Sequence, residues 1–430
     1  MNIQSHDELE EFFLYGKYGI KKIKQSKTKL RLFVIMVIGF IILIFQNKGA
    51  PIVIDVGLSI IVILFICYLW GHTWGAGKIS LSLKYVGLID SGGNTPLLVE
   101  ATHDPENCKV QIWRFVSKGI PLTAWQNKKE QIESALNVHI VQIQQGRQPH
   151  DIILTTVSAD CTIPDKADWQ SECLQKADFV LGLGEDISGD LVINLNRIPH
   201  ILIGGSTGSG KTLLLKLLLM QSLQKGAIVY IADLKGGVDF SKVWQEKCSM
   251  AFDAETVIKV LNDITNELEN RKAALNDADC ANIRQYNNEI GYKYPHIIFA
   301  CDEIAELLDK TGLDKTQKEQ TATIERLLSL IARQGRAFGI HLILATQRPD
   351  ANVLPGQIKN NIDCRICGRA DNVLSQIILD NTSAAEQIPK DAQGRFITQD
   401  GHLFQAYLFD ENAELHNVPA LQEVHPCCRG

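Results

Sequence analysis

A glycine-rich motif between a short apolar stretch and a leucine-rich segment constrains the fold of this chain more than any other feature. Residues 201–219 read ILIGGSTGSGKTLLLKLLL and fit the pattern G-x-x-x-x-G-K-[ST]. The apolar residues 201–203 predict a buried strand, and the leucines after the loop predict a helix. Glycines let successive backbone N–H groups face one anion, and the helix adds the positive end of its dipole. The motif therefore predicts a phosphate-binding loop.

Each position of the motif has a chemical role. Lys211 is expected to reach the β and γ phosphates of a nucleotide, and Thr212 is expected to hold Mg²⁺. A glycine-rich turn that binds no nucleotide is the alternative, but the strand before the loop and the helix after it are the context that the motif requires. We therefore expect ATP and Mg²⁺ as cofactors. The predicted nucleotide-binding residues are Gly205, Ser206, Thr207, Gly208, Ser209, Gly210, Lys211 and Thr212.

The length and charge of the chain set wider limits. A chain of 430 residues is long enough for two or three domains. The formal net charge of -6 gives no overall signature of nucleic-acid binding. Contact with a polyanion such as DNA must then come from a local basic patch, for example the lining of a pore.

The N-terminal region predicts attachment to a membrane. Two apolar runs, residues 32–45 and 52–70, are separated by a break at 46–51 and predict two membrane spans joined by a tight turn. A buried helical hairpin is the alternative, and a cleaved signal peptide fits poorly because no small-residue cleavage site follows the first run. Basic residues before the first run place the N-terminus and the rest of the chain in the cytoplasm. These are Lys21, Lys22, Lys24, Lys27, Lys29 and Arg31.

The middle of the chain mixes strand and helix patterns. Apolar and polar residues alternate in 110–116, as in a half-buried strand, and a helical period runs over 125–136. This region predicts a small α/β domain, and no residue pattern in it points to catalysis. The expected division is a membrane segment, a small α/β adaptor domain and a motor domain, over residues 1–75, 76–180 and 181–430.

A pair of acidic residues completes the predicted site. From residue 181 the chain alternates strand and helix as a parallel sheet does, and the strand expected at 297–301 ends at Asp302 and Glu303. At the carboxyl end of a strand beside the phosphate-binding loop, the first acid can hold Mg²⁺ and the second can activate the attacking water. Adjacent acids are common at strand ends, so the pair alone does not indicate a catalytic site. It does so here because a phosphate-binding loop precedes it in the sequence. A later strand, 340–345, ends close to Gln347.

Five segments between residues 184 and 409 carry a more specific signal. They read IPHILIGGSTGSGKT, DLKGGVDF, IIFACDE, RQGRAFGIHLILATQRPDANVLPGQIKNNI and IILDNTSAAEQI. Together they resemble the FtsK/SpoIIIE family of ring-shaped DNA-pumping ATPases, because unrelated P-loop ATPases do not carry the block around ATQRP. The resemblance implies a RecA-like P-loop ATPase domain with a parallel sheet, assembly as a homohexamer with ATP between subunits, and DNA as the substrate.

The resemblance also implies catalytic roles. Lys211 contacts the phosphates, Glu303 activates water, and Gln347 senses the γ phosphate. Chromosome translocases normally have an arginine before ILD, where this chain reads VLSQ, so the trans-acting arginine has several candidates. Arg336 is taken as the site residue, and the full set is Arg333, Arg336, Arg365 and Arg369.

By the same resemblance, two loops face the central channel of the ring and contact DNA. They surround Lys235 and Lys359, and both are expected to leave the sheet away from the nucleotide. The alternative is that both lysines are solvated surface residues. Lys359 has the stronger case, because small and amide side chains surround it in GQIKNNI and leave room for a phosphate backbone.

The expected domain order is most similar to one branch of the family. After Asp410 only 20 residues remain, too few for the winged-helix domain of chromosome translocases. A motor on two membrane spans and a small adaptor looks like the TcpA-type coupling proteins of conjugative elements, which meet a relaxase or transfer-channel proteins at the cytoplasmic membrane. A chromosome-partition translocase is the alternative within the family. A type VII protein-secretion motor fits less well because those chains carry several P-loop domains, and a non-hydrolysing scaffold fits least because the acids and the polar sensor are present.

Overall fold

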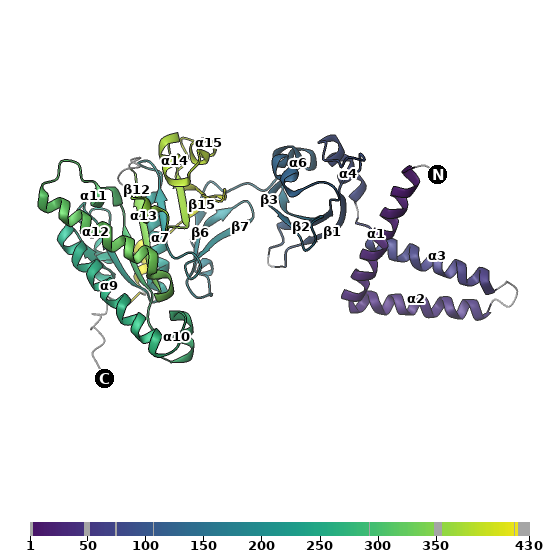
Figure 1. The fold of residues 1–430 in the computed structure, drawn as a ribbon, viewed down its shortest axis with the longest axis horizontal. Coiled ribbons are helices and arrows are strands. Elements are labelled where there is room, and N and C mark those ends of the chain that lie inside the picture. The colour runs from purple at the N-terminus through teal and green to yellow at the C-terminus, as the bar shows by residue number, and fades with distance from the viewer. Residues whose placement is uncertain are drawn as a thin grey trace. The chain divides into compact units, whose positions relative to one another are not determined.

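The computed structural model divides the chain into two compact units, Met1–Cys161 and Thr162–Gly430 (Figure 1). From the sequence, the boundary is expected at 180/181. Residues 162–180 instead lie with the motor, because β5 (Ala167–Asp168) pairs with β15 (Leu403–Leu408) and the Trp169 ring packs edge-on against Tyr407. The structure describes residues 3–46, 52–73, 75–105, 107–291, 293–347, 355–416 and 418–419.

The first unit begins with three helices, of which the first was not predicted. A Cβ atom built on Gly19 of α1 would lie 1.8 Å from the carbonyl oxygen of Cys67 on α3. A Cβ on Gly71 would lie 1.7 Å from the carbonyl oxygen of Tyr15. The two glycines therefore allow the backbones of α1 and α3 to touch, as small residues do at close helix crossings. The helices are α1 (Ile3–Gln25), α2 (Lys27–Gln46) and α3 (Ile52–Gly71).

The two apolar runs of the sequence lie on α2 and α3. Among the helices in the described part of the chain, none is by itself both long and apolar enough to cross a membrane. One bent pair, Ser59–Gly71 with Ala76–Tyr85, meets both conditions when its two segments are taken together. Most of the predicted break between the runs, residues 47–51, lies outside the described residues.

The small domain is a four-stranded antiparallel sheet in the order β1-β2-β4-β3, covered by short helices. Phe115 on β2 packs against Trp125 in its core, and both are fully buried. The helix expected over 125–136 is broken at Lys128, whose ammonium donates to the carbonyl oxygens of Val86 and Gly87 at 2.9 and 2.7 Å. The elements are α4 (Ala76–Tyr85), β1 (Leu97–His103), β2 (Val110–Val116), α5 (Leu122–Asn127), α6 (Lys129–Leu136), β3 (Val138–Gln145) and β4 (Asp151–Ser158).

The second unit is built on one large sheet in the order β10-β9-β11-β12-β8-β13-β14-β15-β6-β7. From β10 to β13 the strands run parallel, as predicted, but from β13 to β7 each pairs antiparallel with its neighbour. The expectation of a parallel sheet is therefore confirmed from β10 to β13 and wrong beyond β13. In the pair β14 and β15 the short turn 399–402 joins the two strands, and a parallel pair needs a longer crossover. The strands are β6 (Val180–Asp186), β7 (Gly189–Asn194), β8 (Ile201–Gly204), β9 (Ile228–Ala232), β10 (Ser249–Ala251), β11 (Ile297–Cys301), β12 (Ile340–Thr346), β13 (Cys364–Gly368), β14 (Arg395–Thr398) and β15.

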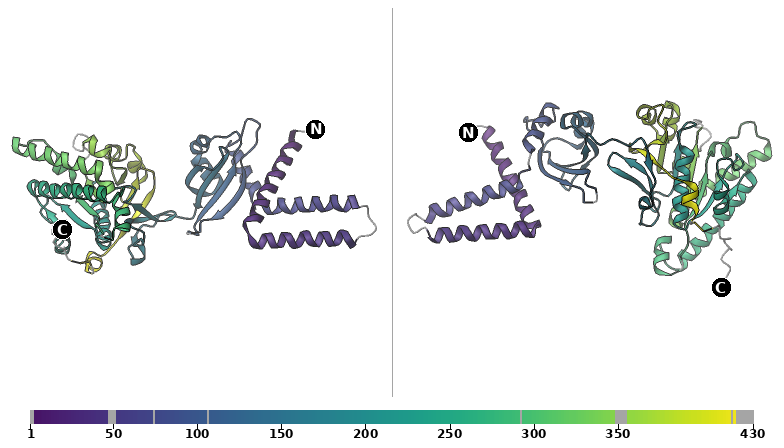
Figure 2. Two further views of the ribbon diagram at one scale, coloured as in Figure 1. Left: turned by 60° about the horizontal axis from the view of Figure 1, so that its bottom comes forward. Right: turned by 180° about the vertical axis from the view of Figure 1, so that it is seen from behind.

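Helices cover both faces of this sheet (Figure 2). Ile201 and Ile203 of β8 lie in the core with α7, whereas Leu202 lies in the core with α9 and α12, so alternate residues of one strand are buried on opposite sides. The helices are α7 (Lys211–Gln224), α8 (Lys242–Lys247), α9 (Ala254–Asp277), α10 (Ile283–Glu289), α11 (Ile304–Leu308), α12 (Lys315–Gln334), α13 (Gly356–Lys359), α14 (Asn372–Leu379), α15 (Ser383–Gln387) and α16 (Glu411–His416).

Candidate nucleotide-binding site

The glycine-rich loop lies between β8 and α7, and Lys211 begins the helix. Gly210 has a φ of 96°, a conformation that L side chains rarely adopt. A Cβ there would also lie 3.1 Å from the backbone of Gly394, which leaves no room for a side chain. The loop therefore needs glycine at this position for its backbone shape and for its packing. This agrees with the strand, loop and helix predicted from the sequence.

Hydrogen bonds hold the loop to two other segments, one that follows β13 and one that precedes β14. The carbonyl oxygen of Arg369 accepts a hydrogen bond from the Ser206 N–H at 2.8 Å, and its guanidinium donates to the Thr207 carbonyl at 2.7 Å. The Gly394 N–H donates to the Ser209 carbonyl at 2.9 Å. Arg369 was one of the candidate trans-acting arginines, but in the structure it positions the loop of its own chain.

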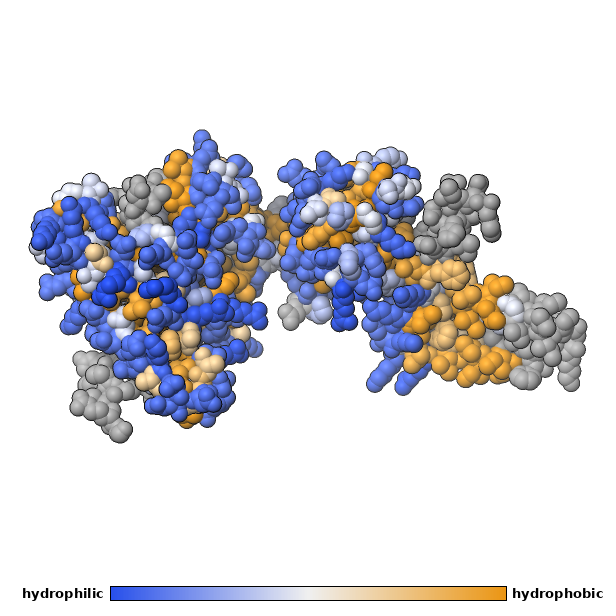
Figure 3. Space-filling view, viewed as in Figure 1, coloured by the Kyte–Doolittle hydropathy of each residue, from blue (hydrophilic) through white to orange (hydrophobic). Residues whose placement is uncertain are grey.

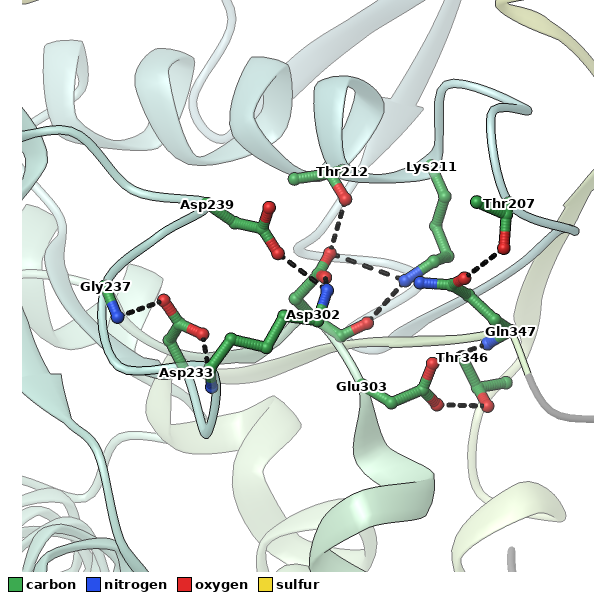
Figure 4. Close-up of polar contacts among 11 residues, drawn as sticks. Thr207, Lys211, Thr212, Asp233, Gly237, Asp239, Asp302, Glu303, Thr346 and Gln347 are labelled. Carbon is green, nitrogen blue, oxygen red and sulfur yellow. Dashed lines mark hydrogen bonds and ion pairs between the residues drawn. The ribbon is translucent and has the colours of Figure 1, made fainter.

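Two loop side chains converge on one carboxylate (Figure 4). The Lys211 ammonium donates to the backbone carbonyl of Asp302 at 2.5 Å and lies 3.4 Å from its Oδ1. The Thr212 hydroxyl donates to the same Oδ1 at 2.8 Å. Lys211 and Asp302 are almost fully buried. A hydroxyl and a carboxylate side by side are the oxygen ligands that Mg²⁺ prefers, so the residues predicted as its ligands fit the ion.

Glu303, the predicted base, has both carboxylate oxygens held. The Thr346 hydroxyl donates to its Oε1 at 2.7 Å, and the Gln347 N–H donates to its Oε2 at 2.9 Å. Both oxygens of the side chain thus act as hydrogen-bond acceptors, which fixes its orientation at the site. The side-chain oxygen of Gln347 accepts a hydrogen bond from Thr207 at 2.9 Å, which links the predicted sensor to the loop. Figure 4 shows these contacts beside Lys211.

The LKGGVDF segment forms a loop after β9 that is tied down by Asp233. Its Oδ1 accepts the Lys235 N–H and its Oδ2 accepts the Gly237 N–H, both at 3.0 Å. Asp233 is itself buried, so the loop has a fixed base next to β11. Asp233 is not among the site residues predicted from the sequence. An acidic residue at the end of a strand, followed by glycines, was the signal that could have identified it.

Lys235 lies at the nucleotide site, and the expectation that it points away from the nucleotide is wrong. Its ammonium is 2.6 Å from Oδ2 of Asp239 and 3.3 Å from Oδ2 of Asp302. The hydrogen bond to Asp239 and the charge of Asp302 raise the pKa of Lys235 against the opposing effect of burial. The chain turns back here because Asp233 holds Gly237, a contact that the lysine and its spacing could not reveal.

Lys359, the other predicted DNA contact, is in an ion pair within its own chain. Its ammonium is 2.6 Å from Oδ1 of Asp380, and the Arg365 guanidinium binds Oδ2 of the same carboxylate. These two cations hold the pKa of Asp380 below its usual value. Arg365 is buried and fully engaged, which does not fit a residue that acts on a neighbouring subunit.

Arg336 lies in the turn just before β12, at the amino end of that strand. The loop follows the carboxyl end of β8, which runs parallel to β12, so Arg336 is at the opposite edge of the sheet from its own nucleotide site. Its side chain is exposed, as is that of Arg333, whose Nε donates to the Ser329 carbonyl at 3.1 Å. Arg336 is therefore remote from the nucleotide site of its own chain.

Comparisons with known proteins agree with this site. A family model described as the FtsK/SpoIIIE family matches residues 166–351. The chain is 31% identical over 275 residues to DNA translocase FtsK of Campylobacter jejuni, covering 60% of this chain and 28% of the relative. It is 34% identical over 219 residues to FtsK of Treponema pallidum, covering 47% of this chain and 26% of the relative. The match therefore spans well under a third of these curated translocases.

A solved structure extends the similarity over most of the chain. It is the pCW3 conjugation coupling protein TcpA in a monomer form with ATPγS. The two chains are 34% identical with a TM-score of 0.57, and the match covers 79% of this chain and 96% of the other.

Proposed function

Since this chain belongs to the FtsK/SpoIIIE family, we propose that it is an ATP-driven DNA translocase that serves as a membrane-anchored coupling protein in conjugative DNA transfer. The observation that carries the catalytic part is the convergence of Lys211 and Thr212 on Asp302, beside a Glu303 carboxylate held at both oxygens. This arrangement matches what phosphoryl transfer to water requires.

The residues of the site divide the hydrolysis step between them. Lys211 neutralises charge on the β and γ phosphates, and Glu303 accepts the proton of the attacking water. The water oxygen forms a bond to the γ phosphorus while the bond to the β–γ bridging oxygen breaks, and ADP keeps that electron pair. Mg²⁺ held by Thr212 and Asp302 would supply further positive charge to the phosphates. Gln347 connects Glu303 to the loop and is placed to respond to the γ phosphate.

Ring assembly is supported by the position of one exposed arginine, Arg336. Arg336 is exposed at the edge of the sheet opposite its own loop, so it can complete a site only in a neighbouring subunit. A homohexamer with ATP between subunits would use it in this way. In such a ring Lys359 is the remaining proposed DNA contact, and a DNA phosphate would have to replace Asp380 as its partner.

The conjugative role is proposed from the extent of similarity. The chain covers 96% of TcpA but only 28% of the FtsK protein of Campylobacter jejuni. Chromosome partition is the alternative within the family, whose curated relatives are named as DNA translocases. A relaxase or transfer-channel protein would be the partner of a conjugative coupling protein but not of a chromosome-partition translocase.

Anchoring in the bacterial cytoplasmic membrane, with the motor in the cytoplasm, is proposed from the surface of α2 and α3. Apolar side chains are exposed along both helices, and Figure 3 shows them as one hydrophobic surface. Exposed apolar patches of this kind mark contact with a membrane or a partner. Examples are Leu32, Ile35, Ile38, Ile61 and Leu69, each more than half exposed.

The test is ATP hydrolysis by the purified full chain with single-stranded DNA, duplex DNA or candidate secreted proteins. We expect DNA to stimulate hydrolysis and Lys211→Ala to abolish it. Stimulation by a secreted protein and not by DNA would place the chain in the protein-secretion class. Deleting the gene separates the two DNA roles: loss of transfer between cells with normal chromosome partition supports conjugation, and the reverse result supports partition.

A further inference from the structure

A groove of about 830 Å³ lies between α1 and the sheet of the small domain. Side chains of α1 form one wall, among them Tyr18 and Lys21, and the other wall includes Arg114 on β2 and the turn between β3 and β4. Leu14, Val116 and Ile153 add apolar surface to the lining. All of the lining belongs to the first unit, whereas the residues of the nucleotide site belong to the second.

Positive charge dominates the groove. Only one carboxylate, Asp151, is found among the described residues that line it, and Arg114 is paired with Glu100 at 3.7 Å. An excess of cations around a concave surface raises the local concentration of anions. The lining cations are Lys17, Lys21, Lys24, Arg114 and Arg147. The groove therefore favours a negatively charged ligand.

The remaining polar groups favour an anion that also carries hydroxyls. Asp151 is 8% exposed, and its Oδ1 accepts no hydrogen bond although the His150 Nε2 lies 3.8 Å away. Burial and the charge of Asp151 raise the pKa of Tyr18, so its hydroxyl stays a proton donor. A plain phosphate gains nothing from a buried carboxylate, whereas a ligand hydroxyl can donate to it.

The surface next to the groove is apolar, which favours a ligand that has an apolar part. Lys24 and Gln25 line it at the end of α1, and α2 begins at Lys27 with exposed apolar residues soon after. Lys22 fixes this corner by donating to the carbonyl oxygens of Gly71 and Val99, each at 3.3 Å. In Figure 3 hydrophilic side chains lie directly beside the hydrophobic surface of α2 and α3. A ligand with an anionic head and apolar tails matches both surfaces.

We propose that this groove binds the glycerol-phosphate headgroup of an anionic phospholipid, with phosphate among Lys17, Lys21 and Arg147 and a glycerol hydroxyl donating to Asp151. The acyl chains would follow the apolar surface of α2. This site rests on the proposed membrane anchoring and holds the small domain against the lipid surface. A nucleic acid fits less well because it has no apolar part to cover the neighbouring helix.

The experiment uses the full chain in uncharged maltoside micelles at low salt, titrated with soluble dihexanoyl phosphatidylglycerol. We expect saturable binding, with weaker binding of dihexanoyl phosphatidylcholine, dihexanoyl phosphatidate and inorganic phosphate. Lys17→Gln with Lys21→Gln should weaken phosphatidylglycerol binding about 25-fold, since each lysine near an anionic lipid contributes about fivefold. The control, Lys84→Gln with Lys109→Gln, removes two exposed lysines of the same unit outside the groove and should leave binding unchanged.

Three results would overturn the site. They are equal binding of inorganic phosphate, equal losses in the two double variants, and displacement of the lipid from the groove by a single-stranded oligonucleotide, which would make it a nucleic-acid site. A separate experiment tests the membrane proposal. If alkaline carbonate extracts the chain from cell membranes, the proposed anchoring is wrong. DNA-stimulated ATP hydrolysis in the same samples reports on the motor and does not depend on the groove.

Discussion

The ammonium of Lys235 lies 3.3 Å from Oδ2 of Asp302, whose other oxygen accepts the Thr212 hydroxyl at 2.8 Å. The carboxylate predicted to bind Mg²⁺ is thus already paired with a cation. Mg²⁺ held by Thr212 and Asp302 would lie close to this ammonium, and two cations at such a distance repel each other. Lys235 and the metal ion therefore compete for Asp302. Asp239, 2.6 Å from the same ammonium, offers Lys235 an alternative partner.

Replacing Lys235 tests this competition. In Lys235→Ala we expect the Mg²⁺ concentration for half-maximal ATP binding to fall by a factor of roughly 1.4 to 5, because a partly exposed ion pair contributes about 0.2–1 kcal/mol. Binding of a fluorescent ATP analogue at increasing Mg²⁺ measures it without relying on turnover. Lys242→Ala, on the helix that follows the loop, is the control. A higher Mg²⁺ requirement in Lys235→Ala would mean that the lysine assists the metal.

Glu303→Gln separates binding from chemistry. The amide keeps the size of the side chain but cannot take a proton, so ATP should still bind while turnover falls by orders of magnitude. Lys211→Ala should instead weaken ATP binding itself. Glu306→Gln, an exposed change on the helix after Glu303, is the matched control and should hydrolyse ATP normally. Wild-type turnover by Glu303→Gln would remove it from the mechanism.

Asp380→Asn tests the ion pair that binds Lys359. The pKa of Asp380 is depressed, so its contribution to stability is present above its usual pKa near 3.8 and is lost as the pH falls through the lower folded value. Asn tolerates the left-handed φ of 62° at this position. We expect Asp380→Asn to lower the free energy of unfolding at pH 7 by about 0.5–1 kcal/mol. The difference from wild type should shrink in acid, whereas exposed Asp391→Asn should show no difference at either pH.

Three buried histidines predict acid sensitivity of the motor. His341 donates from Nδ1 to the Pro199 carbonyl at 2.9 Å, and when its ring is neutral its Nε2 accepts a hydrogen bond from His296 Nδ1 at 2.8 Å. Burial is the main cause that lowers the pKa of His296 to about 4 and of His341 and His200 to about 3. The unfolded chain binds protons below its pKa of about 6.5 and the folded chain does not, so stability falls as the pH drops from about 6.5 toward 4.

The variant His296→Asn isolates one of these protons. The Asn amide can donate to His341 as the imidazole does but does not titrate. The slope of unfolding free energy against pH should therefore decrease by about 1 kcal/mol per pH unit between pH 6 and 4.5, because the unfolded imidazole is mostly protonated there and the folded one mostly neutral. Urea denaturation across this range measures it, with exposed His103→Asn as the control. An unchanged slope would mean that His296 is already protonated in the folded chain.

Membrane topology gives the fifth prediction. Basic residues before the first apolar run favour a cytoplasmic N-terminus. A cysteine introduced at Asn47 should react with an impermeant maleimide added outside intact cells, and one at Ser5 or Ser241 should not. The parent chain reports labelling of native cysteines. External labelling at Ser241 would overturn the two-span arrangement.

The sequence predicted those parts of the motor that depend on neighbouring residues. The strands β8 and β11 and the start of α7 follow from short apolar runs and a glycine loop, and the structure has them where they were expected. The acids after β11 could be placed because parallel strands end at one edge of a sheet. Local pattern was enough for the phosphate loop and the acids beside it.

Features that need contacts between distant residues were missed. Lys235 and Asp302 are 67 positions apart, and nothing local to either residue shows that they meet. His200, His296 and His341 likewise come together from the starts of three different strands, β8, β11 and β12, which are far apart in the sequence. The antiparallel half of the sheet was missed because short strands such as β14 carry few residues from which a period can be read. The helix α1 was missed because its sequence is polar. Its contacts are with α3 and the small domain, which are distant in the sequence, so no local pattern reveals them.

The hydrogen bond from the Gly394 N–H to the Ser209 carbonyl has a mechanical consequence. Gly394 accepts in turn from the Ala406 N–H at 2.8 Å, so the phosphate loop is joined in series to β15. We expect a load on the antiparallel strands to pass through these two hydrogen bonds into the loop and to change the spacing of its N–H groups. Resistance on the transported polymer would thus alter how tightly the loop holds phosphate, and the velocity of a single motor under tension would depend on ATP concentration and force together.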